Sequence, residues 1–267
     1  MNFRKKINQK YNLNRQSKSL NQTWMKDVGY DESPNYKENL GLPHLEDFLQ
    51  VTSKSIDFVK ICTDQVLKYP ENWIKKKVLK YKKYNIKTYL DHTYFLEAYN
   101  LNSVEEAIIY GSQLGFDYFE FMSTYNDIPD KDLLNWINIC KRNNLKILYE
   151  HHPEKNWSSK NNNFTNSDKI ISMLKIFFEN DAEKLVLDHD EFELQSNHEV
   201  NNYNEIISYL SLDKICFEVT SPKEGETIWI KNLEDYFKLF GFNINVSNIM
   251  PSQVLYVNKL RLNSKNC

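Results

Sequence analysis

Short runs of apolar and aromatic residues recur along the chain at fairly regular intervals. They are dense in Val, Ile, Phe and Tyr, a composition typical of strands that are buried on both faces. We expect strands over residues 56–62, 86–90, 116–121, 145–149, 185–187, 215–217 and 242–246, with a weaker first strand over residues 23–28.

Amphipathic segments with a helical period separate these runs. They predict helices over residues 45–51, 104–115, 130–143, 168–180, 202–210, 227–240 and 252–262. A strand followed by a helix, repeated eight times, favours an α/β fold of the (βα)8 or TIM-barrel type, in one domain over residues 23–267. An open doubly wound sheet is the alternative, because the number of units does not by itself close a barrel.

The start of the chain has a different composition. The segment 1–20 carries six Lys and Arg side chains and no acid. No apolar stretch follows it, so it does not resemble a secretory signal. We therefore expect residues 1–22 to form a flexible, solvated basic arm.

Composition argues against several function classes. The formal net charge of −2 does not favour nucleic acid as a partner, and no apolar run is long enough to span a membrane. The four cysteines show no CxxC pairing, which indicates a reduced, cytoplasmic protein with Cys62, Cys140 and Cys216 in the core. Glycine-rich nucleotide-binding loops and GxSxG motifs are absent from the sequence.

Carboxylates stand at the carboxyl ends of four successive predicted strands. They belong to Glu120, Glu150, Asp188 and Glu218, which follow one another at a nearly regular spacing. The spacing between Glu120 and Glu150 also leads back to Leu90 and Lys60, and forward from Glu218 to Asn248. Matched positions on neighbouring barrel strands point into one cavity, so we expect these residues at the mouth where barrel active sites lie. Ordinary polar caps at strand ends are the simpler interpretation.

Four carboxylates in one cavity repel each other unless a cation compensates them. Oxygen ligands favour Mg²⁺. Lys60 could neutralise an acid, bind an anionic substrate or donate a proton, and a plain salt bridge is an equally good interpretation.

Histidines gather at the same strand ends. Of six histidines, four follow a predicted strand: His92, His151, His152 and His189. Successive residues of a strand point to opposite sides. If Glu150 faces the cavity, we expect His152 to face it too, as a proton donor or metal ligand, and His151 to turn towards the helices.

Six segments together resemble the phosphosulfolactate synthase family. They are LGLPHLEDFL (40–49), IDFVKICTDQVLKYP (56–70), LGFDYFEFMSTYNDIP (114–129), LKILYE (145–150), KICFEV (214–219) and NINVSNIMPSQVLYVNKLR (243–261). They lie in the family's order, and the similarity covers roughly residues 24–262.

The resemblance implies a homo-oligomeric (βα)8 barrel that uses Mg²⁺ to add sulfite to C3 of phosphoenolpyruvate, a small anionic substrate. It implies Glu150 and Asp188 as metal ligands. Substrate-binding residues would be Lys60, Glu120, Glu218, Asn245 and Asn248, and Lys60, His152 or Lys155 would be catalytic.

The sequence also departs from the family's pattern. After the second strand, the family's Gly-Trp-Gly-Thr is replaced by a segment that begins at Cys62. After the third strand, Gly-Gly-Thr is replaced from Asp91. After the fifth strand, Val-Gly-Lys-Lys is replaced from His151, and Asp190 stands where an arginine is expected. These changes remove positive charge where two anions should bind. Two alternatives therefore remain open: a metal-dependent barrel enzyme with a different small substrate, and a non-catalytic protein similar to plant heat-stress-associated proteins.

Overall fold

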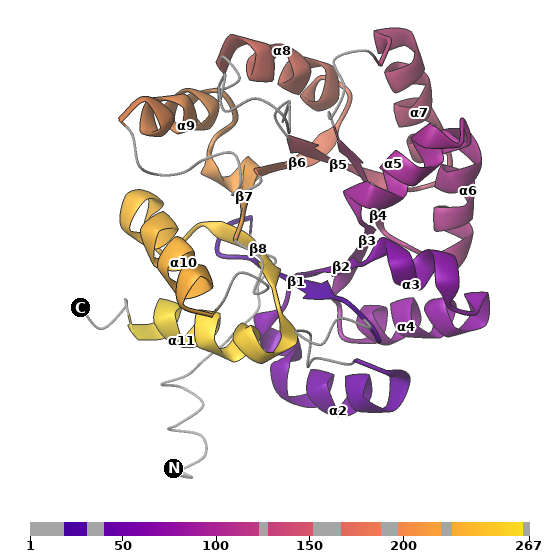
Figure 1. Cartoon of the computed structure of the whole chain (residues 1–267), viewed down its shortest axis with the longest axis horizontal. Helices are drawn as coiled ribbons and strands as arrows, with labels where there is room; N and C mark the ends of the chain where they lie inside the picture. The colour runs from indigo at the N-terminus through magenta and orange to yellow at the C-terminus, as the bar shows by residue number, and fades with distance from the viewer. Residues whose placement is uncertain are drawn as a thin grey trace.

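A closed parallel barrel forms the centre of the molecule. The computed structural model describes residues 19–30, 40–122, 128–151, 167–187, 197–219 and 226–263. The barrel strands follow chain order and every neighbouring pair is parallel, so the predicted (βα)8 barrel is confirmed and the open sheet is excluded (Figure 1). The strands are β1 (Thr23–Asp27), β2 (Phe58–Ile61), β3 (Lys87–Leu90), β4 (Tyr118–Met122), β5 (Lys146–His151), β6 (Ala182–Leu187), β7 (Ile215–Glu218) and β8 (Asn245–Ile249).

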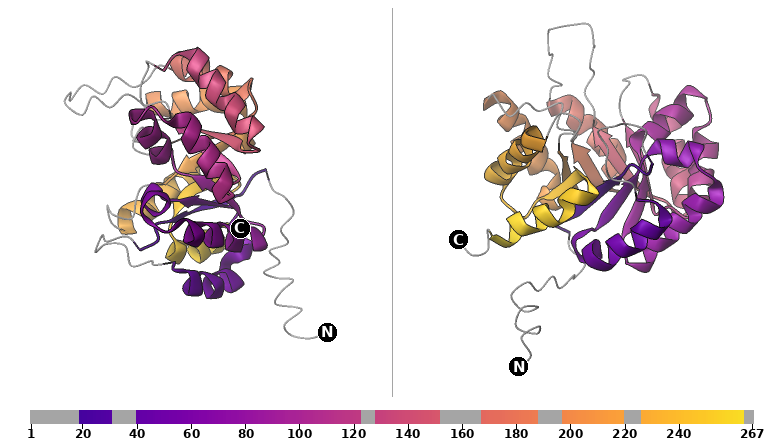
Figure 2. Two further views of the ribbon diagram at one scale, coloured as in Figure 1. Left: turned by 90° about the vertical axis from the view of Figure 1, so that its right-hand side faces the viewer. Right: turned by 60° about the horizontal axis from the view of Figure 1, so that its bottom comes forward.

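Helices surround the barrel on its outside (Figure 2). In the described residues they are α2 (Leu42–Thr52), α3 (Thr63–Lys68), α4 (Glu71–Lys83), α5 (His92–Asn100), α6 (Val104–Leu114), α7 (Asp130–Arg142), α8 (Ser167–Phe178), α9 (Asn197–Leu210), α10 (Glu226–Phe240) and α11 (Val254–Asn263). Short 3₁₀ turns lie at Ser53–Ser55, Leu212–Lys214 and Pro251–Gln253. None of the described helices combines the length and the apolar character needed to cross a bilayer.

Helix α4 was missed from the sequence because lysines make up much of it, namely Lys75, Lys76, Lys77, Lys80, Lys82 and Lys83. Its buried face consists of Ile74, Lys77, Val78 and Tyr81. A lysine within that face masks the apolar period, and its charge is matched by Asp27 of β1, 2.6 Å away. The apolar stripe of a helix is therefore harder to recognise when a buried ion pair interrupts it.

Side chains alternate along each strand between the barrel interior and the helix side. One layer of the barrel interior, which we call the floor, is an apolar cluster below the carboxyl ends of the strands. It consists of Trp24, Phe58, Tyr89, Tyr118, Leu148, Val186 and Cys216. Trp24 stacks on Phe58 with ring centroids 4.3 Å apart. At the next inward-facing position of each strand, Phe58 is followed by Lys60, Tyr118 by Glu120, Leu148 by Glu150 and Cys216 by Glu218. The interior thus changes from an apolar floor to a charged mouth within one side-chain repeat.

The cysteines only partly match the prediction of three core residues. Cys140 and Cys216 are fully buried, the first on α7 and the second inside the barrel. Cys62 is half-buried at the start of α3, where it packs against Val28 and Met250.

Leu90 does not point into the cavity, contrary to the regular spacing seen in the sequence. The β2–β3 register sets Tyr89 opposite Lys60 and Leu90 opposite Ile61. Leu90 belongs to the core between the barrel and the helices, where its Cδ1 atom lies close to Gly111 of α6. The number of residues between two strand ends includes the lengths of the intervening loops and helix. The face that a residue occupies is decided only by the strand register, so equal spacing does not guarantee the same face.

Residues 19–22, which the sequence assigns to the basic arm, pack against the barrel floor. The ammonium group of Lys184 donates to the carbonyl of Ser19 at 3.0 Å, and the guanidinium group of Arg261 donates to the carbonyl of Gln22 at 3.0 Å. The side chain of Gln22 in turn accepts from the indole N–H of Trp24 at 3.1 Å. The ordered domain therefore begins before residue 23, and the remainder of the predicted arm, residues 1–18, lies outside the described residues.

Two truncations test this boundary. Deleting residues 1–18 is expected to leave the melting temperature nearly unchanged, because this segment carries six cations, no acid and no apolar periodicity. Deleting residues 1–22 removes acceptors from buried Arg261 and Lys184, which should lower the free energy of unfolding by about 1–3 kcal/mol. Thermal unfolding of both truncated proteins measures the difference, and a large loss on removal of residues 1–18 alone would contradict the prediction.

Candidate active site

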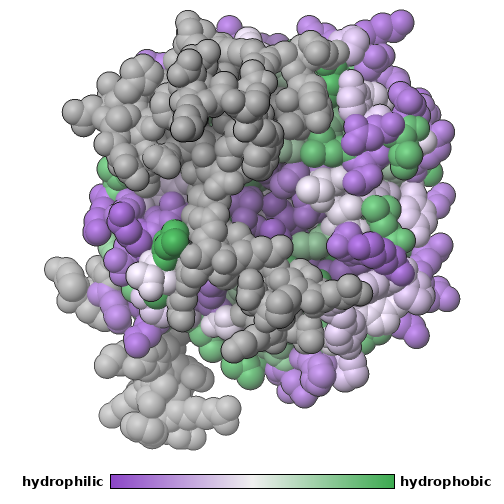
Figure 3. Space-filling model, in the orientation of Figure 1, coloured by the Kyte–Doolittle hydropathy of each residue, from purple (hydrophilic) through white to green (hydrophobic). Residues whose placement is uncertain are grey.

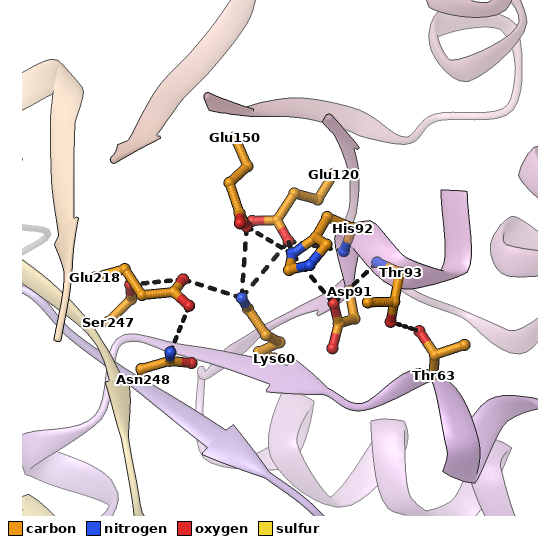
Figure 4. Close-up of polar contacts among 10 residues, drawn as sticks. All are labelled: Lys60, Thr63, Asp91, His92, Thr93, Glu120, Glu150, Glu218, Ser247 and Asn248. Carbon is orange, nitrogen blue, oxygen red and sulfur yellow. Dashed lines mark hydrogen bonds and ion pairs between the residues drawn. The ribbon is translucent and has the colours of Figure 1, made fainter. Parts of the chain in front are cut away.

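The centre of the mouth is a lysine surrounded by three glutamates from three other strands. The ammonium nitrogen of Lys60 lies 3.1 Å from Glu218, 3.6 Å from Glu150 and 3.8 Å from Glu120, measured to their Oε2 atoms (Figure 4). All four side chains are at most 6% exposed. The structure thus brings together the four residues predicted on β2, β4, β5 and β7. Hydrophilic residues gather at the centre of the face seen down the barrel (Figure 3).

The charges of this cluster are mutually dependent. Burial alone would lower the pKa of Lys60, but the carboxylates of Glu120, Glu218 and Glu150 outweigh it and hold that pKa well above its usual value. Burial raises the pKa of Glu120 to about 7, although Lys60 opposes the shift. Lys60 therefore remains a cation, while Glu120 can carry a proton near neutral pH.

Strand β8 adds amide and hydroxyl groups to the cluster. The side-chain amide of Asn248 donates to Glu218 Oε1, and the hydroxyl of Ser247 lies 3.5 Å from Glu218 Oε2. Asn248 has a positive φ of 61°, a left-handed conformation that asparagine tolerates better than most residues. This local departure from strand geometry accompanies its contact with Glu218.

Asn245 is not brought to the mouth, which corrects its predicted place among the substrate-binding residues. Its amide donates to the carbonyl of Ile215 at 2.9 Å, and its Oδ1 atom accepts from the backbone N–H of Gln22 at 3.0 Å. These partners lie at the floor of the barrel, because β8 begins at Asn245 and only its later residues reach the mouth. Asn245 therefore joins the N-terminal segment to the barrel.

Asp91 and His92 enter the mouth directly after β3. The ring Nδ1 of His92 lies 2.7 Å from Glu150 Oε2 and 3.3 Å from Asp91 Oδ1, and its backbone N–H donates to Glu120 Oε2 at 2.9 Å. Burial lowers the pKa of His92, but the carboxylates of Glu150 and Asp91 more than reverse this and hold it well above the usual value. His92 is therefore a second cation of the mouth, partly buried, when no metal is bound.

Three of these groups have the spacing of a metal site. Ligand atoms of Asp91, His92 and Glu120 all lie within 4.8 Å of one another. Glu120 is fully buried, and its Oε1 atom has no hydrogen-bond partner in the described part of the chain. A bound cation would satisfy that oxygen, so the residues present fit a divalent metal ion.

Comparison with known proteins shows the family of the chain. The family model described as (2R)-phospho-3-sulfolactate synthase (ComA) matches residues 12–266. The chain belongs to this family. It is an enzyme family, and the resemblance seen in the sequence is confirmed.

Two relatives of the ComA family have been named phosphosulfolactate synthase. The protein from Methanocaldococcus jannaschii is 25% identical over 230 residues, which cover 83% of this chain and 87% of the relative. The protein from Methanothermobacter thermautotrophicus is 20% identical over 235 residues, which cover 84% of this chain and 85% of the relative.

Solved structures support the fold alone. KGPDC from Streptococcus mutans superposes with a TM-score of 0.54 at 8% identity, covering 92% of this chain and 98% of that one. The putative copper homeostasis protein CutC from Streptococcus agalactiae gives a TM-score of 0.54 at 10% identity, covering 85% and 97%. At such low identity, shared architecture carries no information about the reaction.

Several residues predicted from the ComA resemblance lie outside the described residues. They are Asp188, His152 and Lys155, and His189 lies outside them too. His151 is described: it is 4% exposed and its Nδ1 atom lies 3.1 Å from the hydroxyl of Tyr149. Tyr149 stacks on Phe177 of α8, so His151 lies on the helix side of β5, where the alternation of the strand puts it.

The mouth also contains Asp91 and Lys26, which sequence reasoning did not list as site residues, and His92, which it noted only among the strand-end histidines. Asp91 and His92 follow β3 directly, and alternation from the inward-facing Tyr89 leads to Asp91. Lys26 of β1 lies opposite Lys60 in the strand register and occupies the inward-facing position after Trp24. Counting by two from an aromatic floor residue would have identified both Asp91 and Lys26.

Proposed function

We propose that the protein adds sulfite, or a related sulfur nucleophile, to C3 of phosphoenolpyruvate. Membership of the ComA family supports this reaction class. The observation that carries the proposal is the buried Lys60 ammonium group, held among Glu120, Glu150 and Glu218 at the barrel mouth. Such a charge, fixed before the substrate arrives, suits a reaction in which negative charge develops on a carboxylate.

The addition can be followed atom by atom. The sulfur lone pair forms the C3–S bond, and the π pair of the C2=C3 bond moves onto the substrate carboxylate as an ene-diolate. A proton delivered to C2 completes the reaction, and no group leaves. The protein must therefore hold two anions, stabilise the ene-diolate and supply one proton.

Lys60 is proposed to stabilise the developing charge rather than to donate the proton, because its neighbouring carboxylates keep its pKa well above the usual value. Glu218 and Asn248 hold each other beside Lys60 and would position the substrate. His152 and Lys155 remain the proposed proton donors.

Mg²⁺ is the cation that the family resemblance implies, and when bound it would add positive charge beside the ene-diolate. In the described residues, Asp91, His92 and Glu120 are spaced to hold a divalent cation. Glu150, predicted as a ligand, lies beside them at 2.7 Å from His92. Asp188 remains a predicted ligand from β6.

Steady-state turnover tests the proposal. With phosphoenolpyruvate, sulfite and Mg²⁺, the protein should form a product containing a new carbon–sulfur bond. His152→Ala should then lower kcat by about 10²-fold or more, as expected for a lost general acid. His151→Ala is the matched control, because that ring faces the helices, and it should change kcat far less. Equal small effects from both variants would move the proton-donor role to Lys155.

The charge of the mouth favours a second candidate, a metal-dependent barrel enzyme acting on a less anionic substrate. The mouth contains four carboxylates and three basic side chains. The carboxylates belong to Asp91, Glu120, Glu150 and Glu218, and the basic side chains to Lys60, Lys26 and His92. This leaves little free positive charge for two strongly anionic substrates. Turnover of an uncharged or singly charged enol, without turnover of phosphoenolpyruvate, would select this candidate; no turnover with either would favour the non-catalytic alternative.

The homo-oligomer implied by the resemblance remains a proposal. Light scattering of the purified protein would measure its molar mass directly.

A further inference from the structure

We infer that the mouth binds a divalent transition-metal ion in preference to Mg²⁺, and that His92 is the ligand responsible. This deepens the proposed function, because the ion would serve the same mouth. Asp91 and His92 follow β3 directly and lie beside Glu120 of β4, so two neighbouring strands bring these three ligands together.

The separations match those around a small metal ion. His92 Nδ1 lies 3.3 Å from Asp91 Oδ1 and 3.7 Å from Glu120 Oε2. Ligands bound at about 2.1 Å stand about 3.0 Å apart in an octahedral site and about 3.4 Å apart in a tetrahedral one. One ion would therefore be shared by Asp91 Oδ1, His92 Nδ1 and a carboxylate oxygen of Glu120 once the His92 ring gives up its 2.7 Å contact with Glu150 Oε2.

The backbone holds two of these ligands in position. Asp91 is the N-cap of α5, and its Oδ1 atom accepts from the backbone N–H of Thr93 at 3.1 Å. The backbone N–H of His92 donates to Glu120 Oε2 at 2.9 Å. The buried Glu120 keeps its Oε1 atom without a partner in the described residues, which leaves an acceptor free for a cation. Preorganised ligands with an unsatisfied oxygen are what a metal site requires.

The kind of ligand decides the kind of ion. Mg²⁺ prefers oxygen ligands and retains several waters, whereas imidazole favours Zn²⁺, Co²⁺, Fe²⁺ and related ions. A set of one imidazole nitrogen and two carboxylates therefore selects the transition series. The alternative role for His92 is that of a countercharge for Glu150 and Asp91, with no metal bound to the ring.

Direct binding distinguishes these two roles. Chelator-treated full-length protein is titrated with Zn²⁺, Co²⁺ and Mg²⁺ by calorimetry, and Co²⁺ binding is also followed by its visible absorption. We expect one equivalent of Zn²⁺ or Co²⁺ to bind at least about tenfold more tightly than Mg²⁺. His92→Ala should weaken Zn²⁺ and Co²⁺ by about 10- to 100-fold, change the Co²⁺ spectrum and alter Mg²⁺ affinity much less.

Matched variants keep the test decisive. Glu120→Gln should weaken all three ions, while His44→Ala, which removes an exposed histidine of α2, should change none. His92→Gln removes the imidazole but keeps a polar side chain. If its circular dichroism spectrum matches that of the parent, weaker Zn²⁺ binding by this variant reflects loss of the ligand and not misfolding. Equal affinity for Mg²⁺ and Zn²⁺, or unchanged Zn²⁺ affinity in both His92 variants, would overturn the inference. Selective binding without turnover of phosphoenolpyruvate would uphold it while rejecting the proposed function.

Discussion

Replacing Lys60 by methionine is expected to cost both stability and activity. Methionine keeps the length of the side chain but removes the charge that compensates Glu218, Glu150 and Glu120. Breaking a buried ion pair by removing one partner typically costs about 3–5 kcal/mol, because the other charge is left uncompensated. At pH 8 we expect a loss of this size in denaturant unfolding, with partial recovery at pH 5, where Glu120, with its pKa of about 7, carries a proton.

Turnover should fall as well, by about 10²- to 10³-fold if Lys60 stabilises the ene-diolate. Lys77→Met is the matched control. It removes another fully buried lysine, which pairs with Asp27 on the helix side of β1. Both variants should lose stability, but folded Lys77→Met should retain turnover near that of the parent. Normal turnover in folded Lys60→Met would remove Lys60 from the proposed mechanism.

Replacing Glu120 by glutamine is expected to change how stability depends on pH. Burial raises the pKa of Glu120 to about 7 in the folded protein, from an ordinary value of 4.5. Because the folded value is the higher one, the folded state gains stability from the bound proton below pH 4.5. That stability is lost as the pH rises through 7, and the difference between the two pKa values corresponds to about 3 kcal/mol.

Glutamine has no proton to lose, so the variant should match the parent near pH 4.5 and exceed its stability by up to about 3 kcal/mol at pH 8. Denaturant unfolding in the presence of a chelator measures this difference without bound metal. Glu97→Gln, an exposed change on α5, should follow the parent at every pH. Parallel pH profiles for the parent and Glu120→Gln would mean that Glu120 is already ionised in the acidic range.

The charged mouth could be predicted because strands impose a period of two. Once the strands were recognised, Lys60, Glu120, Glu150 and Glu218 followed as residues near the carboxyl ends of strands on the inward-facing side. Their mutual contacts depend only on the closed barrel and on side chains long enough to meet at its centre. The barrel itself followed from the repeated alternation of apolar runs and amphipathic helices.

Other features depend on contacts that sequence intervals do not encode. Leu90 matched the regular spacing of the strand ends but not the register, which sets Tyr89 opposite Lys60. Asn245 belongs to the strand expected to reach the site, yet it lies at the wrong end of β8. His92 reaches the cluster from the first turn of α5, so strand alternation alone does not reveal it.

A crystal structure with phosphoenolpyruvate and a divalent cation would test the central claim most directly. The account predicts that the substrate lies in the barrel mouth with an anionic group within hydrogen-bonding distance of Lys60, and that the cation contacts Asp91, His92 and Glu120. Two results would contradict this account. One is phosphoenolpyruvate bound outside the barrel mouth. The other is a mouth that contains no substrate at a saturating concentration, with Lys60 still paired only with its three glutamates.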